Sequence, residues 1–316
     1  MGAIADIIAK VRLYVDEPAV NTKFTNAILT GFIRSAWAEI MRDINSVADN
    51  KIRARYDITI VADQHEHALP PSIGEFLSFE KYNDDGLLVS EVIPRHPLNP
   101  VGPGLIIEGP MLYLDPTWNE GETMRITYVP NGDVPPHDST AGILLVGTSS
   151  GTTLTGVTTM TVAAAPTTGD LDGRLNAYAG YVLRILTQDG DWTENGANTE
   201  AIVQERVITA YDNTTRKVTF APTLDPLPGW SADTPPTLDD ANTSYEILPL
   251  HFNLCEEILA LLISRKIAAA IADRSRMQTL NLEYQNALRA VRLTVAQMEQ
   301  RAGSRFIRSV RGRRSR

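Results

Sequence analysis

The spacing of the apolar residues changes twice along this chain of 316 residues, from helical to β-like and back to helical. Near the N-terminus, helical spacing predicts one helix over roughly residues 3–14 and a second that begins after the N-cap residue Thr25. Helical spacing returns at Leu250 and predicts two further helices, the last reaching about Ala302 before Gly303. The two ends of the chain together therefore predict a four-helix core.

The stretch between these helices has the signature of β structure. From Ile52 to Val129 short alternating apolar segments, separated by Gly and Pro, predict a small antiparallel meander. The next stretch is rich in Gly, Thr, Asp and Pro, and six short strands are predicted in it. We therefore predict an α+β fold with the following parts: a discontinuous helical core with the meander, residues 1–130 and 248–302; an inserted acidic β domain, residues 131–247; and an Arg-rich C-terminal tail, residues 303–316.

Charge is sorted by segment along the chain. The whole chain has a net charge of −9. The predicted insert carries fifteen acids against five bases, a net charge of −10, whereas residues 301–316 contain seven arginines and no acid. An acidic body with a basic end suggests that each has a different partner.

Motifs that could support catalysis or metal binding are weak in this sequence. Gly147–Gly151 matches a G-x-S-x-G nucleophile elbow, but the residues that follow are not those of the helix the motif requires. His65 and His67 could both face a metal, yet further ligands are not evident, and the single Cys255 rules out a cysteine cage. We therefore expect no enzyme and no cofactor. We also expect no signal peptide and no membrane span, because no stretch of 18 or more apolar residues occurs.

The last helix carries a narrow apolar stripe that is typical of a helix packing against another helix. Four of its residues are seven apart, with further apolar residues between them. We predict a seam between helices or between subunits at Met277, Tyr284, Leu288, Val291, Val295 and Met298.

The arginine tail is the strongest candidate for a docking site. Its guanidinium groups suit carboxylates or phosphates equally, so protein docking and phosphate binding are both open, with a disordered solubilising end as the third reading. The apolar residues between the arginines favour protein docking, since phosphate binding does not need them. The residues predicted to dock are Arg305, Phe306, Ile307, Arg308, Val310, Arg311 and Arg313.

Several segments resemble the head–tail adaptor (connector) proteins of tailed bacteriophages, in particular the larger adaptors of short-tailed phages. They are Ile8–Glu17 with the helix Ala27–Ile40, Leu112–Pro116 leading to Ile126–Pro130, and Leu248–Leu250 opening two helices that include Tyr284–Leu288. The insert also resembles a β module of phage structural proteins, at Gly180–Val182, Val207–Tyr211, Val218–Phe220 and Ser244–Ile247.

The resemblance implies a ring, usually of twelve subunits, beneath the portal protein. Such a ring extends the DNA channel and offers a platform for tail components such as a nozzle or tube protein. Double-stranded DNA passes through the lumen without sequence-specific binding, and the protein is a virion component assembled in the host cytoplasm. Two other functions stay open on the sequence alone: a carbohydrate-active hydrolase, given the β-rich acidic insert, and a DNA-binding packaging protein acting through the arginine tail.

Overall fold

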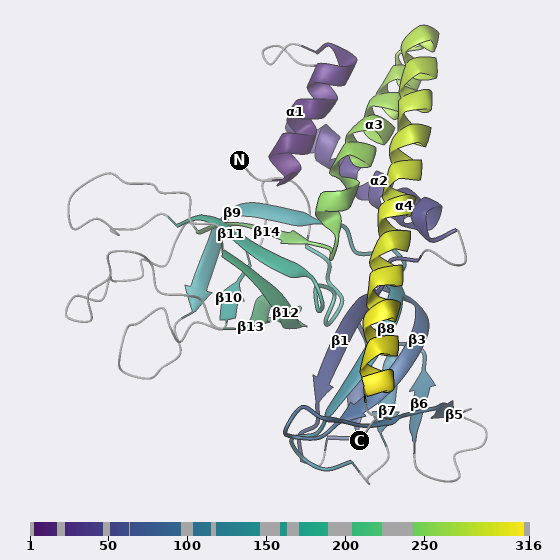
Figure 1. Cartoon of the computed structure of the whole chain (residues 1–316). Helices are drawn as coiled ribbons and strands as arrows, with labels where there is room; N and C mark the ends of the chain where they lie inside the picture. Colours follow the sequence, from purple (N-terminus) through teal and green to yellow (C-terminus); the bar gives the residue numbers. More distant parts are fainter. Residues whose placement is uncertain are drawn as a thin grey trace, which may run out of the picture. The chain divides into compact units, whose positions relative to one another are not determined.

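The computed structural model describes the following residues: 3–17, 23–46, 51–62, 64–95, 104–114, 118–145, 159–162, 171–188, 204–222 and 243–312. The chain divides into two compact units. One unit contains the helices and comprises residues 3–53 and 251–316, and the other contains the strands and comprises residues 54–250 (Figure 1). The predicted α+β class is confirmed, with helices at both ends of the chain and antiparallel sheets between them.

The helical unit contains four helices, as the sequence predicts. Their bounds are α1 Ala3–Val15, α2 Asn26–Asn45, α3 Phe252–Ala270 and α4 Arg274–Gly312. The Thr25 side chain caps α2 by accepting a hydrogen bond from the backbone N–H of Ile28 at 3.3 Å. Helix α3 is buried nearly all round, and Trp37 of α2 packs on Phe252 of α3 with ring centroids 5.5 Å apart. Because the other three helices pack against α3, it forms the centre of this unit.

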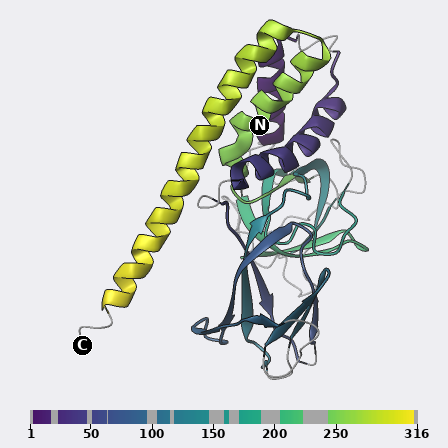
Figure 2. The same cartoon turned by 90° about the vertical axis from the view of Figure 1, so that its right-hand side faces the viewer.

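Helix α4 is longer than the sequence predicts. The Asp273 carboxylate accepts from the backbone N–H of Arg276 at 3.0 Å and so caps its first turn. The prediction that Gly303 ends the helix is wrong, because α4 continues as 39 residues to Gly312. A glycine inside a helix costs only about 1 kcal/mol relative to alanine, so a single glycine does not by itself end a long helix. The helix runs well past the end of α3 (Figure 2).

The predicted meander is instead two small sheets, in each of which some neighbouring strands are far apart in sequence. Their orders are β1-β8-β3-β4 and β2-β7-β6-β5. All pairings are antiparallel except that of β5 with β6. The bounds are β1 Ala54–Thr59, β2 Glu66–Ala68, β3 Ile73–Tyr82, β4 Leu88–Glu91, β5 Pro94–Arg95, β6 Leu105–Glu108, β7 Met111–Leu114 and β8 Thr123–Pro130. The central strand β8 joins β1 to β3, so the first sheet closes only when residues about 70 positions apart have paired.

The six strands predicted between residues 131 and 247 are all present, and they close into a barrel in the order β10-β13-β12-β11-β14-β9. Their bounds are β9 His137–Leu145, β10 Thr159–Thr161, β11 Val182–Gln188, β12 Gln204–Asp212, β13 Lys217–Ala221 and β14 Thr243–Leu248. Closure leaves this sheet without an edge strand.

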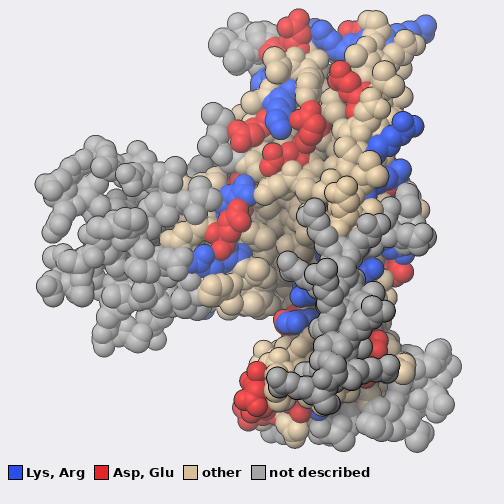
Figure 3. Space-filling view, viewed as in Figure 1, with Lys and Arg blue, Asp and Glu red and all other residues tan. Residues whose placement is uncertain are grey.

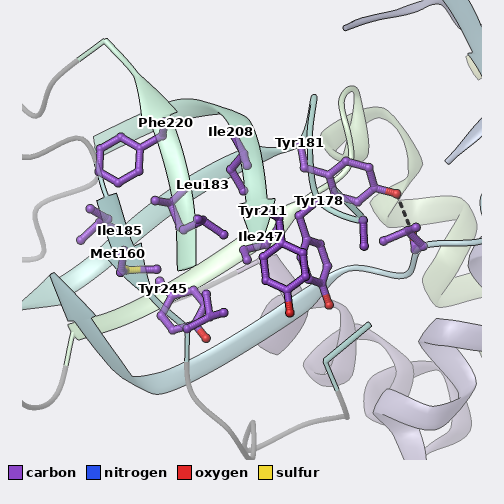
Figure 4. Packing of buried hydrophobic residues seen from close by; sticks show 14 residues of the cluster. Met160, Tyr178, Tyr181, Leu183, Ile185, Ile208, Tyr211, Phe220, Tyr245 and Ile247 are labelled. Carbon is purple, nitrogen blue, oxygen red and sulfur yellow. Dashed lines mark hydrogen bonds between the residues drawn. The ribbon is translucent and has the colours of Figure 1, made fainter. Parts of the chain in front are cut away.

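Tyrosines fill much of the barrel interior (Figure 4). Tyr178 packs edge-on against Tyr211 with ring centroids 4.9 Å apart. The buried hydroxyls have partners: Tyr181 donates to the carbonyl of Val134 at 2.7 Å, and Tyr245 lies 3.0 Å from Nε2 of His137. Each buried hydroxyl thus keeps a hydrogen bond, which avoids the cost of burying an unpaired polar group.

A short loop, residues 176–180, joins the barrel to the first sheet. The Asn176 amide donates to the hydroxyl of Tyr56 at 3.3 Å and to the carbonyl of Ala68 at 3.1 Å. Gly180 has a φ of +83°, and a Cβ atom there would lie 3.2 Å from both the Arg55 carbonyl and the Tyr128 hydroxyl. Both positions therefore need their own residue type, Asn for its amide and Gly for its backbone and its lack of a side chain.

The contacts group the strands differently from the predicted domains. The sequence joins β1–β8 to the helices, whereas the contacts place them in one unit with the barrel. The 176–180 loop accounts for this grouping, because it contacts β1 and β8 directly. The division into a core and an inserted domain over residues 131–247 stays a prediction, and a deletion described in the Discussion tests it.

Candidate docking surfaces

The predicted seam lies on α4, and its residues are buried to different degrees. Tyr284, Leu288 and Val295 are buried, Met277 and Val291 are half-buried, and Met298 is 45% exposed. With Leu280, the three buried residues form the face of α4 that packs on α3. The centre of the stripe is therefore occupied within the subunit, between helices.

Tyr284 fixes α4 to the other helices through two contacts. Its hydroxyl donates to the Asp43 carboxylate at 2.6 Å, and the Arg265 guanidinium lies 4.8 Å from its ring centroid. Burial and the hydrogen bond to Asp43 raise the pKa of Tyr284, so the phenol stays protonated. About two turns further along α4, Arg292 donates a hydrogen bond to the Ser46 hydroxyl at 3.0 Å. These contacts set the position of α4 against the end of α2.

The seven residues predicted to dock, Arg305, Phe306, Ile307, Arg308, Val310, Arg311 and Arg313, lie outside the described side chains. The backbone of six of them belongs to α4, and Arg313 follows its last residue. The third reading of the tail, a disordered end, does not fit the backbone up to Gly312, which is helical. Docking by these side chains stays a prediction.

Surface charges on the helical unit are paired across helices. Lys10 of α1 lies 3.4 Å from Glu257 of α3, and Lys266 of α3 lies 2.8 Å from Glu39 of α2. Figure 3 shows acidic and basic side chains interspersed over the helices on the face in view. Exposed pairs of this kind contribute only about 0–1 kcal/mol each, so they orient the helices more than they stabilise them.

A row of charged residues crosses four strands of the barrel, β9, β14, β11 and β12. Asp138 of β9 lies opposite Glu246 of β14, which lies opposite Arg184 of β11. Arg184 pairs with Glu246 at 3.7 Å and with Glu205 at 2.7 Å. Burial, together with the charge of Glu246, raises the pKa of Asp138 to about 6. The row holds three acids and one base; the Glu205 side chain is half exposed, whereas the Glu246 side chain is buried.

The two histidines considered as metal ligands lie in different environments. His65 is exposed, whereas His67 is 8% exposed and its Nε2 has no hydrogen-bond partner among the described residues. Burial lowers the pKa of His67 below its usual 6.5, with a hydrogen bond to the backbone of Gln64 acting in the opposite direction. His67 is thus a neutral side chain in the core of a small sheet.

We expect His67 to make the strand unit sensitive to acid. Its pKa is lower in the folded than in the unfolded state, so protonation favours unfolding as the pH falls through 6.5. Between about pH 7.5 and about pH 5.5, the Tm of the wild type should fall by about 2 °C more than that of His67→Gln. Thermal unfolding at the two pH values measures this, with His65→Gln as the matched control. An equal fall in the wild type and in His67→Gln would contradict it.

Among the described residues, no group of three or more His, Cys, Asp or Glu is arranged to hold a metal ion. The described helices include none long and apolar enough to cross a membrane. The G-x-S-x-G segment, Gly147–Gly151, lies outside the described residues.

Helix α4 runs past the end of α3 and includes the first part of the Arg-rich segment, as far as Gly312. The closed barrel and the two small sheets form a second unit on the same chain.

Comparison with known proteins gives one family match, over the N-terminal part of the chain. Residues 3–142 match the family described as SU10 adaptor protein. The match covers α1, α2, β1–β8 and most of β9, somewhat less than half of the chain. It confirms the resemblance to phage head–tail adaptors over these residues and supports the role of a structural phage adaptor. No curated protein matches the chain.

Proposed function

We propose that this protein is the subunit of a ring, of twelve copies, that binds beneath the portal of a short-tailed phage. The ring extends the DNA channel and offers a platform to a nozzle or tube protein. The observation that carries this proposal is the match of residues 3–142 to the SU10 adaptor proteins. It accounts for the two-unit build: one unit binds the portal and the other is free for neighbours and tail proteins.

The charge of the chain fits a channel for DNA. Tight contacts to the phosphates would hold the duplex in place, whereas a surplus of acids repels it. The net charge of −9, and the surplus of fifteen acids over five bases in residues 131–247, agree with a lumen that lets DNA slide. We therefore propose that acids line the channel and that binding to DNA is not sequence-specific.

The Arg-rich end of α4 is the proposed portal-docking element. Its backbone is helical as far as Gly312, so it can enter a groove as a helix does in other helix-in-groove complexes. The apolar residues Phe306, Ile307 and Val310 would fill pockets there, and the arginines would pair with acidic rims.

Electron microscopy of the purified protein mixed with its portal tests this function. We expect a ring of twelve subunits on the tail-facing end of the portal, with a lumen lined mainly by acids. The portal alone is the control. Absence of a ring would contradict the adaptor function, and a mostly basic lumen would contradict the proposed channel. Strong salt-dependent affinity of the isolated protein for DNA would favour the packaging alternative, and hydrolysis of a polysaccharide by the monomer would favour the hydrolase.

A further inference from the structure

Helix α4 exposes two leucines on the side opposite the one it buries. Leu282 is 65% exposed and Leu293 is 64% exposed. At about 100° per residue these two positions lie within about 20° of each other around the helix, with Arg289 between them. Arg289 has no ion-pair partner among the described residues. We call Leu282, Arg289 and Leu293 the outer stripe.

The strand unit exposes an apolar patch that includes an acidic residue, whereas the outer stripe includes a basic one. Strand β4 is the outer strand of its sheet, and four large apolar side chains on and beside it are between 57% and 79% exposed. Glu91 of β4 lies opposite Glu80 of β3, so two like charges face each other without a base between them. We call the following residues the hairpin patch: Leu87, Leu88, Val89, Glu91 and Ile93.

A partner of the hairpin patch is more readily bound through the side chains of β4 than through its backbone edge. The register between β3 and β4 shifts at Lys81 and Tyr82, which marks a bulge. Bulges twist an edge strand and hinder the addition of another strand. A partner of this patch is therefore expected to pack on its apolar side chains and to bring a cation to Glu91.

We propose that the outer stripe of one subunit packs on the hairpin patch of the next, so that neighbouring copies of this chain form the ring through this contact. Each surface is exposed in its own unit, so each is available to a second copy of this chain. They differ from each other and carry opposite charge, as a head-to-tail contact requires, and contacts of that kind close into rings. Exposed apolar clusters on a folded subunit commonly mark such interfaces. This inference rests on the proposed ring.

Cysteine crosslinking of rings assembled on the portal tests the contact. The single native thiol, Cys255, is buried, and burial raises its pKa to about 12, so introduced cysteines will react alone. Leu88→Cys and Leu293→Cys both change exposed side chains, so each variant should fold normally. An equal mixture of the two chains, treated with a short bismaleimide, should give covalent adaptor dimers. Either chain alone should give monomers, because each cysteine faces a leucine of its neighbour.

Two further samples sharpen the test. A chain carrying both cysteines should give a ladder of oligomers up to the closed ring. A mixture in which Leu13→Cys, on an exposed position of α1, replaces Leu293→Cys should give no dimers. Rings that form normally in the mixture but give no dimers would overturn this contact and leave the adaptor function standing. Wild-type protein that makes no ring on the portal would overturn both.

Discussion

Chains that end at Gly303 should fold normally but fail to stay on filled heads. The buried face of α4, from Leu280 to Val295, is intact in this truncation, so the helical unit keeps its packing. The truncation removes all seven predicted docking residues and none of the seam residues, so DNA should leak from the head. Sedimentation of filled heads with the truncated protein, followed by nuclease treatment, measures retention of protein and DNA.

The apolar residues of this end should supply most of its binding energy. An exposed ion pair contributes about 0–1 kcal/mol and is screened by salt, whereas burial of a large apolar side chain contributes about 1.5–3 kcal/mol. Phe306→Ala with Ile307→Ala should therefore approach the defect of the truncation although every arginine remains. A tail in which lysines replace all arginines is the matched control. Normal docking of the double variant together with failure of the lysine tail would show that the arginines decide.

Replacement of residues 131–247 by a short Gly/Ser linker should leave a folded helical protein. The strand ending at Pro130 and the packing residue Leu250 both belong to the small sheets, so a short linker can join the two ends. The entropy of loop closure changes only slowly with length. Helical circular dichroism should persist, whereas the sheets lose the cover that the 176–180 loop gives to Tyr56 and Tyr128. Loss of helical signal would contradict the predicted insert.

A second deletion separates the two ways of dividing the chain. Replacement of residues 54–250 removes the whole strand unit and should preserve the helices at least as well. Tryptophan fluorescence reports on each unit separately. Trp37 is buried in the helical unit. Trp118 lies in the strand unit, with the Lys81 ammonium 4.7 Å from its ring centroid. If Trp118 stays in a folded environment after removal of 131–247, the sheets are stable without the barrel.

The helices could be predicted because each carries a broad apolar face and a clear start. Thr25 and Asp273 cap α2 and α4, and α3 is apolar nearly all round. The end of α4 could not be predicted, because a single glycine is only a weak signal for the end of a helix. The sequence also showed no sign that Leu282 and Leu293, eleven residues apart, stay exposed while the seam between them is buried.

The strand β3 was not predicted, although it is the longest in its sheet. Its pairing with β8 shifts between Ile73 and Glu75 and again between Phe76 and Ser78. Each shift moves the following residues to the other face, so the alternation that indicates a strand is interrupted twice. Barrel closure was missed for another reason: it depends on the pairing of β14 with β9, which no local pattern encodes.

The loop of residues 176–180 has a consequence for how such adaptors can exchange parts. Tyr56, Ala68 and Tyr128 lie within the segment that matches the family, whereas their partners Asn176 and Gly180 lie beyond its end at residue 142. A relative with a different β module must therefore present its own amide to Tyr56 and its own close-fitting backbone to Tyr128. Modules of this kind are interchangeable only together with the few residues that join them, so grafts that omit the loop should fail even when each part folds.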